Sequence, residues 1–193
     1  QALIQKYQIT QAPTMIISGE LAKKDALKSF FDANGEIIDQ VFVFRNVFPP
    51  YLDLADNSIK GVVDLTMIAD SACAECYDIT NHQKIIQNFG VKLNEVKTVE
   101  SSSAAGQKLI SQYQLPYLPT IILSTEISRY AQVRQLWSQL GIISNDGNYV
   151  FTEGVKQMGA YRDLASGKII KPATAANQEQ SDSSSAANSQ SAN

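Results

Sequence analysis

The stretch Gly61-Val62-Val63-Asp64-Leu65-Thr66-Met67-Ile68-Ala69-Asp70-Ser71-Ala72-Cys73-Ala74-Glu75-Cys76 decides the fold of this chain. Its first eight residues form a short apolar run that a glycine opens, which predicts a buried strand. Two cysteines follow the run directly. Apolar side chains recur every three or four residues up to Phe89, and they predict an amphipathic helix over residues 74–89, which starts at the cysteines and ends at Gly90.

The residues that follow alternate between strand and helix patterns. The pattern predicts a second strand over 96–99, a helix over 105–113 that stops before Pro116, a third strand over 120–123, a long helix over 126–140 that ends at Gly141, and a fourth strand over 149–151. Because strand, helix and strand in succession form a parallel pair with a right-handed crossover, we predict an α/β fold with a central sheet that helices cover.

The chain repeats part of itself. Residues 3–9 (LIQKYQI) resemble residues 109–115 (LISQYQL), and residues 12–18 (APTMIIS) resemble residues 118–124 (LPTIILS) in the same register. Phe31 then corresponds to Trp137 and Gly35 to Gly141, and residues 51–55 (YLDLA) correspond to residues 161–165 (YRDLA). The alternative is that both stretches share only a helix and strand pattern, but the paired Pro-Thr and Tyr-x-Asp-Leu-Ala positions argue against it.

The repeat divides the chain into three parts. Residues 1–59 correspond to the second half of a unit, and residues 61–171 form the complete unit, with the helix over 126–140 between its third and fourth strands. Residues 172–193 consist almost wholly of Ser, Ala, Asn, Gln and Glu, a composition that cannot bury enough apolar surface to order itself. We predict a disordered tail there.

The two cysteines are the strongest candidates for chemistry. At the start of a helix, free backbone N–H groups and the helix dipole favour a thiolate, so Cys73 is predicted to attack and Cys76, one turn along, to resolve the mixed disulfide. Two alternatives stay open, a structural disulfide and half of a metal site. A mononuclear zinc site would need further ligands, and the single histidine, His82, lies on the apolar helix stripe, where a structural role is favoured.

Together, the Cys-x-x-Cys after a strand and the Leu118-Pro119-Thr120 triplet resemble the thioredoxin superfamily. The resemblance covers the complete unit and part of the first. It implies that Pro119 is a cis proline beside the thiols, that the Leu118 backbone pairs with an extended substrate peptide, and that Pro13 holds the same place in the first unit. It implies no cofactor and no metal, with protein thiols or disulfides as partners.

The cysteine motif differs from that of ordinary thioredoxins, which carry Trp-Cys-Gly-Pro-Cys. Here Ser71 and Ala72 precede the pair, and Ala74 and Glu75 lie between the two thiols. Asp70, Glu75 and Asp78 add negative charge, which disfavours a thiolate. We therefore predict a reducing or slow redox couple rather than a strongly oxidising one.

Composition narrows the possible partners. The chain of 193 residues carries 16 basic and 19 acidic side chains, for a net charge of −3. We expect no nucleic-acid partner, because no basic run is present, and no membrane span, because no apolar stretch reaches the roughly 18 residues required. The first residue is Gln1 rather than Met, which indicates a processed product or a fragment, and we expect an extracytoplasmic location, periplasmic or at the cell surface.

Two functions remain after these exclusions. The first is a thiol–disulfide oxidoreductase or redox relay that uses Cys73 and Cys76 on protein thiols. The second is a redox-inert module in which tandem thioredoxin-like units bind extended peptides at the cis-proline edge.

Overall fold

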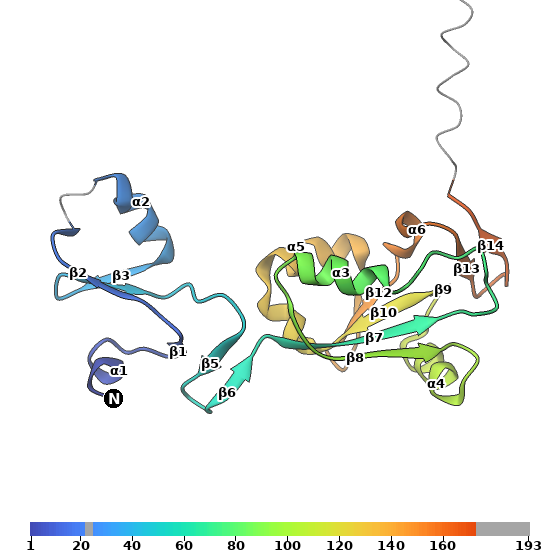
Figure 1. Ribbon diagram of the computed structural model, residues 1–193, viewed down its shortest axis with the longest axis horizontal. Helices are drawn as coiled ribbons and strands as arrows, with labels where there is room; N and C mark the ends of the chain where they lie inside the picture. The colour runs from blue at the N-terminus through green and yellow to red at the C-terminus, as the bar shows by residue number, and fades with distance from the viewer. Residues whose placement is uncertain (22–24, 173–193) are drawn as a thin grey trace, which may run out of the picture.

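The computed structural model describes residues 1–21 and 25–172. Figure 1 shows two parts side by side, the first built from α1 to β6 and the second from β7 onward, joined by the chain near Gly61. The predicted tail falls, except for its first residue, outside the described residues. No helix within the described ranges is both long and apolar enough to cross a membrane.

A five-stranded mixed sheet forms the centre of the second part, in the order β11-β12-β10-β7-β8. Strands β7 and β8 are parallel, and the other neighbours are antiparallel. The strands are β7 (Val62–Ala69), β8 (Lys92–Glu100), β10 (Thr120–Leu123), β11 (Gly141–Ile143) and β12 (Tyr149–Phe151). The predicted α/β class is therefore confirmed in its coarse form, a mixed sheet with helices.

Helices cover both faces of this sheet. One face packs against α3 (Asn81–Asn88) and α5 (Ala131–Leu140), and its core includes Leu65, Ile121 and Trp137. The other face packs against α4 (Ala104–Tyr113) around Ile68, Ile122 and Val150. Successive residues of a strand point to opposite faces of the sheet. Because helices cover both faces, β7 and β10 carry apolar side chains on both sides.

A helix lies between the predicted third and fourth strands, as expected, but its predicted span of 126–140 is wrong, because residues 125–140 do not form one continuous helix. A 3-10 helix, η2 (Thr125–Arg129), precedes α5, and Tyr130 between them is extended. The Tyr130 hydroxyl donates to the Gly61 carbonyl at 2.6 Å and accepts from the Lys92 amide at 2.9 Å. These two bonds anchor Tyr130 at the start of β7 and β8, a position that a continuous helix would not give it.

Three small sheets and short helices complete the described part of the molecule. In the second part, β9 (Tyr117–Leu118), β13 (Tyr161–Asp163) and β14 (Ile169–Ile170) form one sheet, with α6 (Val155–Met158) beside it. In the first part, one sheet has the order β2-β4-β3 and the other β1-β5-β6. Their elements are α1 (Ala2–Lys6), β1 (Gln11–Ala12), β2 (Ile16–Ser18), α2 (Asp25–Asn34), β3 (Gly35–Ile38), β4 (Val41–Phe44), β5 (Tyr51–Asp53) and β6 (Ser58–Lys60).

The two parts share detailed geometry at the positions that the sequence repeat aligns. The Leu54 amide donates to the Thr10 carbonyl at 2.9 Å, and the Leu164 amide donates to the Pro116 carbonyl at the same distance. Thr14 and Thr120 each donate a side-chain hydrogen bond to the carbonyl of an aligned phenylalanine, Phe44 and Phe151 respectively.

Sterics explain why glycine occupies the aligned positions 35 and 141 in both parts. A Cβ on Gly35 would lie 2.1 Å from the Val43 carbonyl oxygen, and one on Gly141 would lie 2.0 Å from that of Val150. No side chain fits at this crossing of helix end and strand in either part.

Candidate functional site

The candidate site lies where β7 ends, at the edge of the second part that faces away from the first. Cys73 and Cys76 form a disulfide with their Cα atoms 5.4 Å apart. The Cys73 amide donates to the Asp70 carbonyl at 3.0 Å, and the Cys76 amide donates to the Cys73 carbonyl at 3.1 Å. The pair is therefore held in two successive turns that follow the strand.

The predicted start of the helix at the cysteines is wrong, because α3 begins only at Asn81. The Tyr77 amide donates to the Ala160 carbonyl at 2.9 Å instead of to the preceding helical turn. Asp78 then accepts from the amide and hydroxyl of Thr80, at 2.9 and 2.7 Å, in a side-chain turn that competes with helix. A helix dipole that begins so far from Cys73 gives its thiolate no direct stabilisation, since the effect fades within the first turn.

The cysteines and the proline loop meet, as the resemblance implies. The Leu118–Pro119 peptide bond is cis, and so is the Ala12–Pro13 bond at the aligned position in the first part. Cys76 Sγ lies 3.9 Å from the Leu118 carbonyl oxygen. A disulfide sulfur has no proton to donate, so this is a contact and not a hydrogen bond. Leu118 buries its side chain, with 2% exposure. Through β9 it pairs with β13 on one side, and no other described strand pairs with it.

The two sulfurs differ in access. Cys73 is only 5% exposed, whereas Cys76 is partly exposed. A hollow of about 210 Å³ reaches both residues and is also lined by Asp70, Tyr77 and Pro119. Because a reactive cysteine must be reached by its partner, this order of exposure is opposite to what an attacking Cys73 requires.

Charged neighbours surround the disulfide, but two of the three acids have cationic partners. Arg162 Nε lies 2.8 Å from Asp70 Oδ2, and Lys171 Nζ lies 3.1 Å from Glu75 Oε2. The side chain of Asp70 is 3% exposed. Neither atom of the Asp70 contact has a well-aligned hydrogen bond, so the attraction is mainly between the charges. The sequence reasoning named the acids but missed Arg162 and Lys171, which lie far along the chain.

The third acid, Asp78, stays charged. Two hydrogen bonds from Thr80 lower the pKa of Asp78. Its carboxylate is occupied with this turn and is fully exposed, so solvent screens its effect on the disulfide.

A metal site was the other interpretation of the cysteine pair. Asp70, Cys73 and Cys76 place one donor atom each within 4.8 Å of one another, a group of three found among the described residues. Zinc binds thiolates and is usually held by four ligands in a structural site, whereas these sulfurs are bonded to each other. While the disulfide is formed, neither sulfur is a thiolate that could bind a metal ion.

Tyr77 connects the proline loop to the buried histidine, a link that the sequence did not indicate. Its hydroxyl donates to the Pro119 carbonyl at 2.8 Å and lies 3.1 Å from His82 Nε2. Since the hydroxyl proton is used for Pro119, the histidine donates from Nε2. Burial lowers the pKa of His82 to about 4 and raises the pKa of Tyr77, so both are neutral at pH 7. His82 is 2% exposed and thus lies in the core, the environment expected for a structural histidine.

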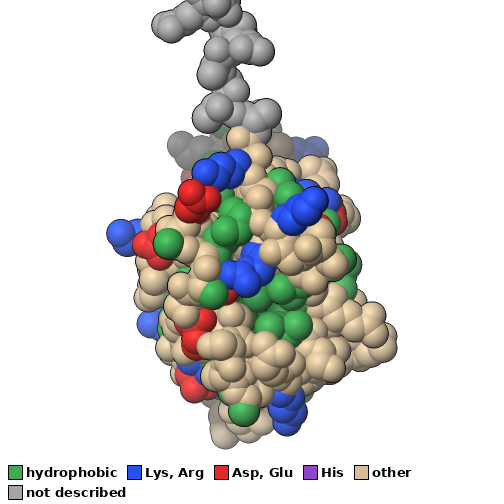
Figure 2. Space-filling view, turned by 90° about the vertical axis from the view of Figure 1, so that its right-hand side faces the viewer, with side chains coloured by type: hydrophobic (Ala, Val, Ile, Leu, Met, Phe, Trp, Pro, Cys, Tyr) green, Lys and Arg blue, Asp and Glu red, His purple; other side chains and the backbone are tan. Residues whose placement is uncertain are grey.

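Figure 2 shows the end of the molecule that carries β9, β13 and β14. Hydrophobic side chains gather near the middle of this face, with Lys and Arg side chains around them and Asp and Glu mainly to one side. A partner on this face would meet apolar side chains and charged side chains together.

Comparisons with known proteins found no matching protein-family model, no matching curated protein and no matching solved structure.

Proposed function

We propose that residues 61–171 form a thioredoxin-like domain and that its Cys73–Cys76 pair exchanges electrons with protein thiols. The observation that carries the proposal is the position of the disulfide at the end of β7, with Cys76 Sγ 3.9 Å from the Leu118 carbonyl beside cis Pro119. A single peptide substrate could therefore contact the disulfide and the edge of β9 at the same time. The parallel β7 and β8 pair further supports the assignment.

The reaction is a two-electron exchange. A substrate thiolate attacks one sulfur of the pair, the Cys73–Cys76 bond breaks, and a mixed disulfide forms. The second substrate thiolate then attacks the substrate sulfur of this mixed disulfide. The substrate leaves oxidised, and both cysteines are left as thiols after taking up the two protons that the substrate thiols lost. The reverse sequence reduces a substrate disulfide.

Substrate is held in this proposal by the backbone of Leu118. Strand β9 has β13 on one side and, among the described residues, no strand on the other. An extended peptide can add there by main-chain hydrogen bonds and bring its cysteine to the pair. A resting disulfide fits a compartment outside the cytoplasm, where such bonds persist.

One observation favours the second function, a redox-inert peptide-binding module. In the first part, β1 pairs with β5 as β9 pairs with β13 in the second part, and Pro13 follows β1 as Pro119 follows β9. The chain thus carries two edges of the same design, which suits the binding of extended peptides.

Activity assays separate the two functions. We expect insulin reduction with dithiothreitol as donor to be lost in both Cys73→Ser and Cys76→Ser, and retained in the distant control Tyr113→Phe. Trapping a mixed disulfide with a substrate thiol in each serine variant identifies the attacking cysteine. Turnover unchanged in both serine variants would sink the catalytic proposal and leave the binding module.

A further inference from the structure

Among the described residues, strand β2 of the first part lacks a neighbour that the aligned strand of the second part, β10, has. Strand β2 lies at the edge of its sheet, with β4 as its only neighbour among the described residues. Its pairing of Ile16 with Val43 matches that of Ile122 with Val150 between β10 and β12. Strand β10, however, also pairs antiparallel with β7 on its other side.

The free backbone groups of β2 follow from its bonds to β4. The Phe44 amide donates to the Met15 carbonyl at 2.9 Å, so Met15 directs its backbone groups toward β4. Because successive residues alternate, Ile16 and Ser18 direct theirs away from β4. Ser124, the counterpart of Ser18, donates its amide to the Asp64 carbonyl on β7 at 3.0 Å. The edge of β2 therefore presents the same donors that bind β7 in the second part.

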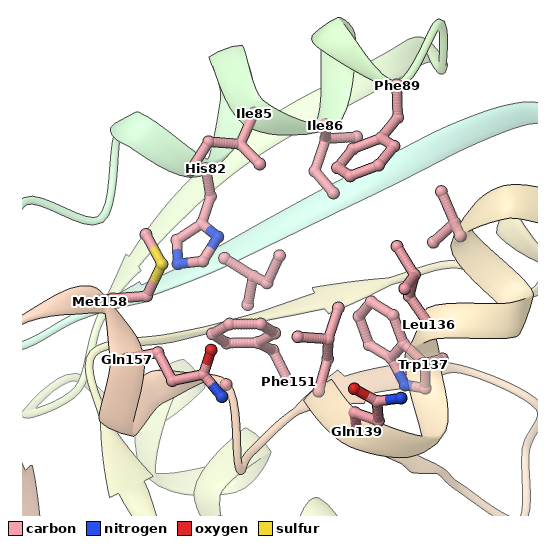
Figure 3. Close-up of a pocket in the computed structure, with 14 residues that line it drawn as sticks. His82, Ile85, Ile86, Phe89, Leu136, Trp137, Gln139, Phe151, Gln157 and Met158 are labelled. Atoms are coloured by element: carbon pink, nitrogen blue, oxygen red, sulfur yellow. The ribbon is translucent and has the colours of Figure 1, made fainter.

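Apolar side chains beside this edge are also uncovered. Met15 is 47% exposed, whereas its counterpart Ile121 is 1% exposed. Leu27 on α2 is 43% exposed, whereas its counterpart Val133 on α5 is 4% exposed. Figure 3 shows the corresponding place in the second part, where His82, Ile85 and Ile86 of α3, with Phe89 just after the helix, face α5 across a cavity of about 260 Å³. Ile121 and Val133 are among the residues that line this cavity. Among the described residues, no helix covers Met15 and Leu27 in this way.

We propose that the β2 edge of the first part binds a strand–helix–strand segment of the same design as β7–α3–β8. Its first strand runs antiparallel to β2 and is apolar on both faces, like Val63, Leu65 and Ile68 in β7. Its helix lies over Met15 and Leu27. A second copy that paired its own β2 with this one is a poorer occupant, because the α2 of that copy already packs on its own β3 and β4 and does not take the place that α3 has in the second part.

The test supplies such a segment to the intact chain. A copy of residues 61–100, with Cys73→Ser and Cys76→Ser in the copy, is joined ahead of Gln1 by a flexible Gly/Ser linker, which gives an effective concentration of about millimolar. Hydrogen exchange is measured at the Ile16 and Ser18 amides, with the Ile17 amide, directed toward β4, as the internal reference. In the control fusion the copy carries Thr66→Pro, which removes a backbone donor on the side of β7 that faces β10.

We expect the Ile16 and Ser18 amides to exchange at least about tenfold more slowly in the first fusion than in the Thr66→Pro control. Equal exchange in the two fusions would overturn the proposal. It would also be overturned if these amides in the unmodified chain became protected as the protein concentration rose, since the occupant would then be a second copy.

Discussion

Asp70, beside the disulfide, forms a largely buried ion pair with Arg162. The variant Arg162→Met tests how much this ion pair contributes to the stability of the fold. Methionine keeps most of the apolar stem but removes the guanidinium that lies 2.8 Å from Asp70. The carboxylate, 3% exposed, would keep only a long bond from the Ser101 hydroxyl at 3.4 Å. Breaking a buried pair on one side costs about 3 to 5 kcal/mol.

The structure places the expected cost at the low end of this range. The Arg162 side chain is 26% exposed, so water already screens the pair in part. We expect Arg162→Met to lower the free energy of unfolding by about 3 kcal/mol in urea titrations at pH 7. The double variant Asp70→Asn with Arg162→Met leaves no uncompensated charge, and it should recover most of the loss.

The matched control is the exposed pair on the other side of the disulfide. Lys171→Met removes the partner of Glu75, and their side chains are 64% and 56% exposed. A pair of this kind contributes about 0 to 1 kcal/mol. If both Arg162→Met and Lys171→Met changed the free energy of unfolding by less than about 0.5 kcal/mol, burial would not make the Asp70 ion pair more stabilising than the exposed one.

Two further predictions concern buried polar groups, and each is read from denaturant titrations. The pKa of His82 is lowered from 6.5 to about 4, so the unfolded chain binds a proton first and stability falls as the pH drops from 6.5 toward 4. His82→Phe should therefore remove about 2 to 3 kcal/mol of the difference in stability between pH 7.5 and pH 4.5, and an unchanged difference would contradict this. Tyr130→Phe removes two hydrogen bonds, to the Gly61 carbonyl and from the Lys92 amide, and should cost about 1 to 3 kcal/mol. Its control, Tyr113→Phe, removes only partly exposed bonds and should cost less than half as much; equal costs would count against the anchoring role of Tyr130.

Local pattern was enough to predict β7, β10 and β12, part of β8, and the helices with a clear apolar stripe, but it missed the short strands β9, β11, β13 and β14. Strand β10 and the end of α3 just before Gly90 follow from residues that are neighbours in the sequence. The aligned repeat carries more information, since it predicts that Phe31 and Trp137 play the same part, and both are buried.

The errors arise where distant residues decide the local backbone. The helix was predicted to begin at the cysteines because apolar spacing continues there, but Tyr77 gives its amide to Ala160, far along the chain. Tyr130 interrupts the long helix for the same reason, through its bonds to the start of β7 and β8. Arg162 could not be assigned to the site, because only the pairing of β13 with β9 brings it to Asp70.

The central claim, that Cys73 and Cys76 form a reversible redox couple, is tested most directly by its equilibrium with dithiol and glutathione buffers. Thiol content is counted by mass-tagging after acid quench across the redox range. We predict a single two-electron transition on the reducing side, nearer to about −270 mV than to the about −120 mV of strong oxidants, because no helix begins at Cys73 to stabilise its thiolate. A pair that stays oxidised in every buffer, or a midpoint near −120 mV, would contradict this account.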